Sequence, residues 1–271
     1  MGTSLALAVQ ATCPNVVIDA VEINPTYRGQ ASRLSVFHHI YPTCDDVTQN
    51  YDMLFLAIPV HAARDLLTWG ASHATNVVDL CSVKSSICTE AHRVGLTAQF
   101  VPSHPMAGKA SGGPKEASAT LFEGRPWLFL KDWHTPADLV RLVSTFGAKP
   151  TFVQDAQTHD EMMAQVSHGI HLTSLSAMLA SDKGIAQAAL SLASVAGPAL
   201  WDITRLAASP AEFWVDTLLD NAAPVRNYLE HLRQEVDAFA RLLQEQDRDG
   251  LSAKLAQAQE IRQQWERGRK Q

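Results

Sequence analysis

The chain has 271 residues, of which 46% are hydrophobic and 18% are charged, and its formal net charge is −6. This length suits one large domain or two smaller ones, with a core large enough to need no stabilising disulfide or metal ion. The acidic balance argues against a nucleic-acid partner, and the lack of an apolar run of 18 residues argues against a membrane span.

The first stretch, "MGTSLALAVQATCP", has an apolar run of only five residues, Leu5–Val9, with no basic residue before it. A secretion signal needs both a longer apolar run and a basic start. The four cysteines form no C-x-x-C pair, which is typical of reduced thiols. We therefore expect a cytoplasmic protein whose first residues form a helix.

Short apolar runs alternate with helical patterns up to about residue 150. The expected buried strands are "NVVIDAVEI", "DMLFLAIPV", "NVVDLC", "AQFVPS" and "PWLFL". Continuous apolar strands separated by helices predict a doubly wound parallel sheet. From Thr158 onward the spacing is helical, with breaks at Gly197-Pro198 and Ser209-Pro210. The fold class is therefore α/β followed by all-α, with domains expected at 1–152 and 153–271.

Glu22 lies at the tip of the first expected strand, twenty residues after Gly2. In dinucleotide-binding folds an acidic residue at this place binds the ribose 2′-OH, and the last glycine of G-x-G-x-x-G lets the first helix pack closely. Gly2 can be that glycine, in which case the first strand and two glycines precede Met1. We then expect weak NAD binding by this chain and normal binding once about ten upstream residues are restored. Alternatively, Glu22 is only a solvated charge. Pro59, near the end of "DMLFLAIPV", is a further expected cofactor contact.

Two polar side chains follow later strands. Ser82 follows "DLC", and His104 follows "FVPS" in a turn that Pro105 stiffens. Ligands of open α/β sheets bind outside the carboxyl ends of the strands, and a histidine there can accept a proton near neutral pH. The alternatives are a helix N-cap for Ser82 and a backbone-bonded loop histidine for His104.

The helical part carries "VSHGIHL" and "DITRLAASPAEFW". His168 and His171 share a helix face, and Ser167 adjoins them. No carboxylate or cysteine completes a metal site with them, so no metal is expected. Asp202 precedes Arg205 by three residues and could hold its guanidinium for a substrate carboxylate. Ordinary helix packing and a surface ion pair are the competing interpretations.

Together these stretches resemble the prephenate/arogenate dehydrogenase family of tyrosine biosynthesis. The resemblance extends through about residue 214 and is carried by "GTSLALA", "DLCSVK", "SHPMAG", "LFEGRPW", "HDEMMAQVSHGIH" and "DITRLAASPAEFW". It implies a Rossmann-type domain, a helical dimerisation domain that forms a homodimer, and NAD as cofactor. The implied reaction is oxidative decarboxylation of prephenate or arogenate.

The resemblance also implies roles for individual residues. His104 would accept the proton of the substrate hydroxyl, and Ser82 would hydrogen-bond both His104 and that hydroxyl while it also lines the cofactor site. The residues implied in holding the substrate are Ser167, His168, His171, Asp202, Arg205 and Trp214, the last of which can reach the neighbouring subunit's site. Gly2, Glu22 and Pro59 would contact NAD.

Ala110 departs from the family, which often has an acidic residue two positions after the glycine of H-P-x-A-G. The preference between prephenate and arogenate, and any feedback inhibition by tyrosine, are left open by the sequence. Two alternatives also remain: another Rossmann-plus-helical dehydrogenase of the β-hydroxyacid type, and a non-catalytic dimeric homologue with impaired cofactor binding.

Overall fold

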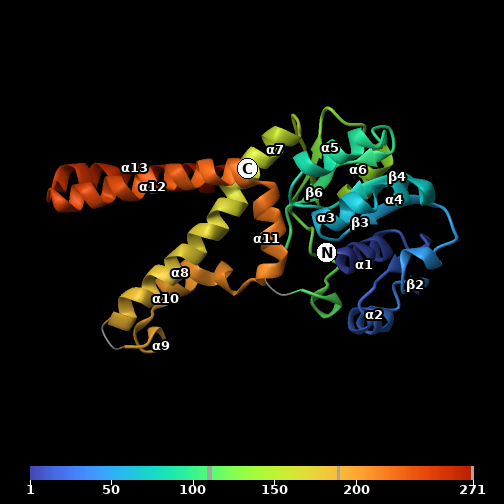
Figure 1. Ribbon diagram of the computed structural model, residues 1–271, viewed down its shortest axis with the longest axis horizontal. Helices are drawn as coiled ribbons and strands as arrows, with labels where there is room; N and C mark the ends of the chain where they lie inside the picture. The colour runs from blue at the N-terminus through green and yellow to red at the C-terminus, as the bar shows by residue number, and fades with distance from the viewer. Residues whose placement is uncertain (109–111, 188–189, 270–271) are drawn as a thin grey trace. The chain divides into compact units, whose positions relative to one another are not determined.

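The structure, a computed structural model, describes residues 1–108, 112–187 and 190–269 (Figure 1). It divides into two compact units, Met1–Ala222 and Ala223–Gln271.

The first unit contains eight strands among its described residues: β1 (Asp19–Val21), β2 (His39–Tyr41), β3 (Tyr51–Leu56), β4 (Ala74–Asp79), β5 (Phe100–Val101), β6 (Ser103–Pro105), β7 (Pro126–Leu130) and β8 (Lys149–Val153). Its α-helices are α1 (Gly2–Thr12), α2 (Pro25–Ala31), α3 (Val60–Asp65), α4 (Leu67–His73), α5 (Ser85–Arg93), α6 (Ala137–Thr145), α7 (Ala156–Met163), α8 (Gly169–Gln187), α9 (Leu192–Val195), α10 (Pro198–Thr204) and α11 (Ala211–Asp220). Shorter turns are η1 (Ser32–Leu34), η2 (Cys44–Asp46), η3 (Pro114–Glu116), the π-helical η4 (Ala164–His168) and η5 (Arg205–Ala208).

The strands form three hydrogen-bonded sheets. Parallel pairing joins β3, β4 and β5, and separately joins β1 to β2. In the third sheet, β7 pairs parallel with β8 and antiparallel with β6. The predicted parallel α/β domain is confirmed, while β2, the antiparallel β6 and β8 were not predicted.

Apolar side chains cover both faces of the sheet. In β4, Val77 enters a core that includes α3, α4 and α5, while the next residue, Val78, enters a second core that includes α1 and α6. Leu128 and Trp127 of β7 divide between the same two cores. Successive strand residues point to opposite faces, so this division shows helices packed on both sides, as a buried parallel sheet requires.

After β8 the described residues form helices joined by short connections and contain no strand, as predicted. α10 begins at Pro198 and has Gly197 as its N-cap, and α11 begins directly after Pro210. Proline suits these places because its fixed φ fits the first turn of a helix, where its missing N–H costs nothing. Both predicted breaks are therefore confirmed.

The second unit contains most of α12 (Ala222–Gln244) and all of α13 (Arg248–Arg269). An ion pair between Lys254 and Glu235 joins the two helices, and the Lys254 Nζ also lies 5.9 Å from the Phe239 ring centroid. Apolar side chains such as Leu243 and Trp265 remain exposed on this unit. No helix in the described part of the chain is long and apolar enough to cross a membrane. The domain boundary expected near residue 152 stays a prediction.

Candidate active site

His104 is at the centre of a connected cluster of polar side chains. It lies within β6, opposite Leu128 of β7, rather than in the turn that the sequence suggested. Its side chain is half-buried, and its Nδ1 lies 3.0 Å from Nε2 of His159. No hydrogen bond joins its Nε2 to any described residue. One ring nitrogen is thus held while the other is available.

His159 and its neighbour Asp160, in the first turns of α7, were missed by the sequence analysis. His159 is completely buried, and its Nδ1 lies 2.8 Å from Oδ1 of Asp160. The signal that could have found His159 is its spacing, because it precedes the buried Met163 by four residues and so shares that inward helix face. The three side chains form a continuous line from Asp160 through His159 to His104.

Asp160 also caps α5 from across the fold. Its Oδ1 accepts from the Lys84 backbone N–H at 2.7 Å, and its Oδ2 accepts from Ser85 N–H at 2.8 Å. A carboxylate is favoured here because the free N–H groups and the helix dipole both attract negative charge. Ser82 is therefore not the cap of α5, which corrects that alternative. Its hydroxyl is half-buried and makes no hydrogen bond with a described residue.

A buried ion pair fixes the strand that carries His104. Asp79 and Lys84 are both completely buried and pair with each other. Asp79 also accepts from the backbone N–H of Cys81 and of Ser103, each at 3.0 Å. Because Ser103 precedes His104, this carboxylate joins the end of β4 to β6. The ion pair thus places the S-V-K turn beside the histidine.

The electrostatics of the cluster keep His104 neutral at pH 7. Burial lowers its pKa well below the ordinary range for histidine, and the neighbouring His159, Lys84 and His168 lower it further. Burial acts to raise the pKa of Asp160, but hydrogen bonds from His159, Ser85 and Lys84 outweigh burial and lower that pKa overall. The cluster therefore combines a neutral imidazole with an ionised carboxylate.

The π-helical turn η4 carries two of the predicted substrate residues. Ser167 is half-buried, and His168 is completely buried. Nδ1 of His168 lies 2.9 Å from Nδ2 of Asn221, which also donates to the Asp160 carbonyl at 2.8 Å. Burial is the main cause that lowers the pKa of His168 to about 4. Asn221 was not predicted, and it links His168 to the backbone of the His104 cluster.

Trp214 of α11 brings the two predicted helical histidines together. Its ring stacks on His171, with centroids 3.6 Å apart and planes 11° apart, and it makes a T-shaped contact with His168, with centroids 6.0 Å apart. In the single chain, Trp214 thus lies against histidines of its own chain.

Near this stack, four buried polar atoms have no hydrogen-bond partner among the described residues: His168 Nε2, His171 Nδ1, Ser174 Oγ and Asn221 Oδ1. Each such atom costs free energy unless a ligand or an ordered water pairs with it. These four atoms are therefore suited to bind a polar ligand.

Asp202 and Arg205 make no described contact with this cluster. Both are exposed, on α10 and η5 respectively. The structure contains no ion pair between these two described residues, and neither makes a ring contact or hydrogen bond with the histidines. Their predicted substrate roles stay predictions.

The expected cofactor residues lie at strand ends. Glu22, Pro59 and Ser82 follow the carboxyl ends of β1, β3 and β4. A Cβ built on Gly2 would lie only 3.0 Å from the Cβ of Ala57, so glycine allows α1 to approach the end of β3. Strand ends and a close helix start are what a dinucleotide requires, so these residues fit NAD.

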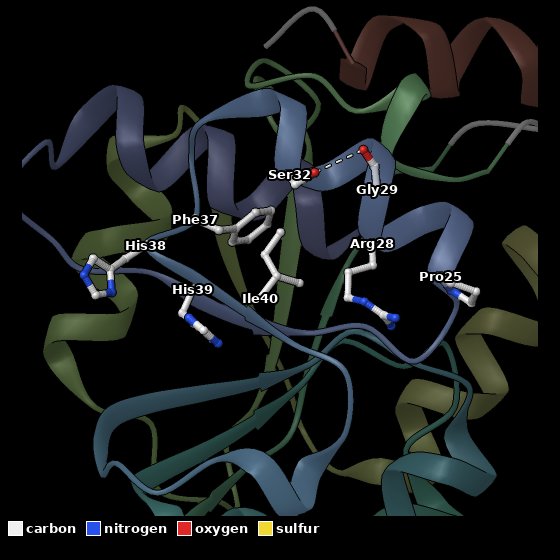
Figure 2. A pocket seen from close by; sticks show the side chains of 8 residues that line it. All are labelled: Pro25, Arg28, Gly29, Ser32, Phe37, His38, His39 and Ile40. Carbon is white, nitrogen blue, oxygen red and sulfur yellow. Dashed lines mark hydrogen bonds between the residues drawn. The ribbon is translucent and has the colours of Figure 1, made fainter.

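Ala110 falls outside the described residues. A hollow of about 430 Å³ lies beside α2 and β2, and none of its lining residues is a predicted site residue. Arg28, His38 and His39 are among the residues that line it (Figure 2). The described residues contain no group of three or more His, Cys, Asp or Glu side chains that could hold a metal ion.

Comparisons with known proteins point to one family. Residues 5–150 match the family model "Prephenate dehydrogenase, nucleotide-binding domain", and residues 155–257 match "Prephenate dehydrogenase, dimerization domain". The chain is 26% identical to a cyclohexadienyl dehydrogenase of Zymomonas mobilis, over 97% of this chain and 92% of that one. It is 25% identical to a prephenate dehydrogenase of Lactococcus lactis, over 97% of this chain and 74% of the other. Its fold matches that of an A. aeolicus prephenate dehydrogenase solved with hydroxyphenyl propionate and NAD+ at a TM-score of 0.87, with 21% identity over 97% of this chain and 94% of that chain.

Proposed function

The chain belongs to the prephenate dehydrogenase family, and we propose that it catalyses the NAD-dependent oxidative decarboxylation of prephenate or arogenate in tyrosine biosynthesis. The observation that carries this proposal is His104, a neutral histidine held through Nδ1 with its Nε2 available. Family membership removes the β-hydroxyacid alternative. A non-catalytic homologue is the alternative that the turnover test addresses.

When bound, NAD+ would act as the oxidant and would take up the hydride from ring carbon C4 of the substrate. His104 Nε2 accepts the proton of the C4 hydroxyl as that hydride leaves, which forms a C4 carbonyl. Loss of the ring carboxylate as CO2 then moves an electron pair through the ring to the C4 oxygen, and His104 returns the proton to it. The product is aromatic, so the chain has mainly to align the substrate and move one proton.

The remaining predicted residues support this assignment. Ser82 has a free hydroxyl beside the strand end and would bond the substrate hydroxyl. The unpartnered atoms of His168 and His171 suit the polar groups of the substrate, and Arg205, oriented by Asp202, would bind a carboxylate. Glu22 at the end of β1 would accept from the ribose hydroxyls, which favours NAD over NADP.

The match to a dimerisation-domain model supports a homodimer formed through the helical part. Exposed apolar side chains such as Trp201 on α10, which is 76% exposed, give that part a surface to bury. The four cysteines are all unpaired, which supports a place in the cytoplasm.

Turnover tests the proposal. The protein is mixed with NAD+ and either prephenate or arogenate, and NADH is followed by absorbance. We expect turnover with at least one substrate, and replacement of His104 by Asn should reduce kcat by roughly 10²–10⁴-fold because it removes the proton acceptor. NAD+ affinity should be unchanged.

The matched control for this substitution is His73→Gln on α4, because Nδ1 of His73 bonds only the nearby Trp69 carbonyl and Ser72. It should leave turnover intact. No turnover with either substrate, or a normal kcat in His104→Asn, would contradict the proposed function of the chain or of this residue respectively.

A further inference from the structure

From the line of contacts between Asp160, His159 and His104 we infer a further role in the reaction. His159 and Asp160 are positioning residues: they hold His104 in the tautomer whose Nε2 is bare, and they take up the positive charge that forms when His104 accepts the substrate proton. This inference rests on the proposed function, because it concerns the proton acceptor of that reaction.

Asp160 is the ionised end of the line. Its carboxylate accepts two backbone hydrogen bonds at the start of α5, from Lys84 and Ser85. An ionised carboxylate can only accept. The short contact with His159, 2.8 Å from Nδ1 to Oδ1, therefore requires that Nδ1 carries a proton.

The proton on Nδ1 of His159 in turn fixes the tautomer of His104. A neutral imidazole has one N–H, so His159 with a proton on Nδ1 has a bare Nε2. That Nε2 lies 3.0 Å from Nδ1 of His104 and must accept from it. His104 then has its single proton on Nδ1, and its Nε2 is left as the acceptor. Every proton in the line is fixed by the carboxylate at its end.

A protonated His104 is unfavourable where it stands, because burial and then the charge interactions with His159, Lys84 and His168 lower its pKa. The opposite charges that balance this environment are Asp79, which is paired with Lys84, and Asp160. Of these two carboxylates, only Asp160 is connected to His104 by side-chain hydrogen bonds, through His159.

A proton shift within the line reduces this cost: burial lowers the pKa of His159 too, but the hydrogen bond with Asp160 acts to raise it, and His104 has no such carboxylate contact. As His104 Nε2 takes the substrate proton, the Nδ1 proton of His104 passes to Nε2 of His159. The positive charge then lies on His159, directly beside the Asp160 carboxylate, which stays ionised. When the C4 oxygen takes its proton back, each proton returns, so no proton is gained or lost over the cycle.

Three substitutions separate the parts of this role. His159→Phe removes the acceptor for His104 Nδ1 and should reduce kcat by roughly 10²–10⁴-fold with KM little changed, by analogy with the loss of the orienting carboxylate in Ser-His-Asp enzymes. His159→Gln keeps an acceptor but cannot take a proton, so it should restore part of that loss. Asp160→Asn removes the charge, so it and His159→Gln should move the acid limb of the kcat/KM pH profile to lower pH.

A spectroscopic readout tests the tautomer without turnover. With ¹⁵N-labelled imidazoles, the His104 signals are assigned as those absent from His104→Asn. We expect the proton on Nδ1 in the unsubstituted protein and in His159→Gln, and a shift toward the Nε2–H tautomer in His159→Phe. This measurement stands even if neither substrate is turned over, so failure of the proposed function is distinguishable from failure of the inference.

The matched control is Asp155→Asn. Asp155 caps the same helix α7 through Thr158 N–H at 2.7 Å, but it is not part of the line. It should leave the pH profile and the tautomer unchanged. The inference is overturned if His104 carries its proton on Nε2 in the unsubstituted protein, if His159→Phe retains normal kcat, or if Asp160→Asn leaves the acid limb unmoved.

Discussion

At the scale of single residues, the site depends on charges buried in pairs. Asp79 and Lys84 are both inaccessible to solvent, and Asp79 has two further backbone donors besides the lysine. Removing one member of such a pair leaves the other charge buried without a partner, which is strongly unfavourable. This pair therefore contributes to stability as well as to the position of His104.

We predict that Asp79→Asn lowers the free energy of unfolding by about 3–5 kcal/mol, as expected when one partner of a buried pair is lost. Denaturant unfolding measures it. The control is Asp138→Asn, which breaks an exposed i,i+3 pair with Arg141 and should change stability by less than about 1 kcal/mol. Equal effects of the two substitutions on the free energy of unfolding would show that the buried pair stabilises the fold no more than the exposed pair does.

Sequence reasoning found part of this residue-level arrangement. Ser82 and His104 follow strand ends, and strand ends can be predicted from apolar runs. His159 and Asp160 were not identified because a helix start rich in polar residues looks solvated, and only the tertiary contact with β6 shows that they face inward. The pairing of Asp160 with the start of α5 joins residues 75 positions apart, and no local pattern can show it.

At the scale of elements, periodicity predicted the helices well and the short strands poorly. β2 has three residues and β6 has three, and each is defined by its pairing with a neighbour rather than by an apolar run of its own. The π-helical turn at Ala164–His168 interrupts a region whose spacing reads as one continuous helix. Such turns add a residue to the helix and often mark functional sites; this one carries Ser167 and His168.

The contact between α1 and the end of β3 leads to an element-level prediction. Gly2→Ala would place a Cβ 3.0 Å from that of Ala57, so α1 must move outward and the affinity for NAD+ should fall about tenfold or more, as expected where a helix start binds the pyrophosphate. Titration of NAD+ by fluorescence measures it.

Gly29→Ala in α2 is the control for this prediction, because a Cβ there meets nothing within 4 Å. It should leave the affinity unchanged and stabilise the helix by roughly 0.5–1 kcal/mol. Unaltered NAD+ affinity in Gly2→Ala would mean that the close approach does not shape the cofactor site.

At the scale of the whole molecule, the buried histidines make stability depend on pH. The folded-state pKa values of His104 and His168 are lowered, mainly by burial. Below a pH of about 6.5 the unfolded chain therefore binds protons that the folded chain does not. The stability present at pH 7 is lost progressively as the pH falls from there toward the lowered folded-state values, about 4 for His168.

We predict that the free energy of unfolding falls between pH 7 and pH 5, by up to roughly 1.4 kcal/mol per pH unit for each such histidine. Denaturant unfolding at several pH values measures it. An unfolding free energy that is the same at pH 7 and pH 5 would show that these histidines are not held neutral by the fold.

We propose that the protein couples hydride transfer to decarboxylation and that His104 accepts the substrate proton. The most direct measurement is the amount of NADH formed and of CO2 released in the same reaction, with prephenate and with arogenate, for the unsubstituted protein and for His104→Asn. We predict equal amounts of NADH and CO2 with at least one substrate, and a joint fall of both rates by roughly 10²–10⁴-fold in the variant. NADH without matching CO2, or equal rates in the two proteins, would contradict the account.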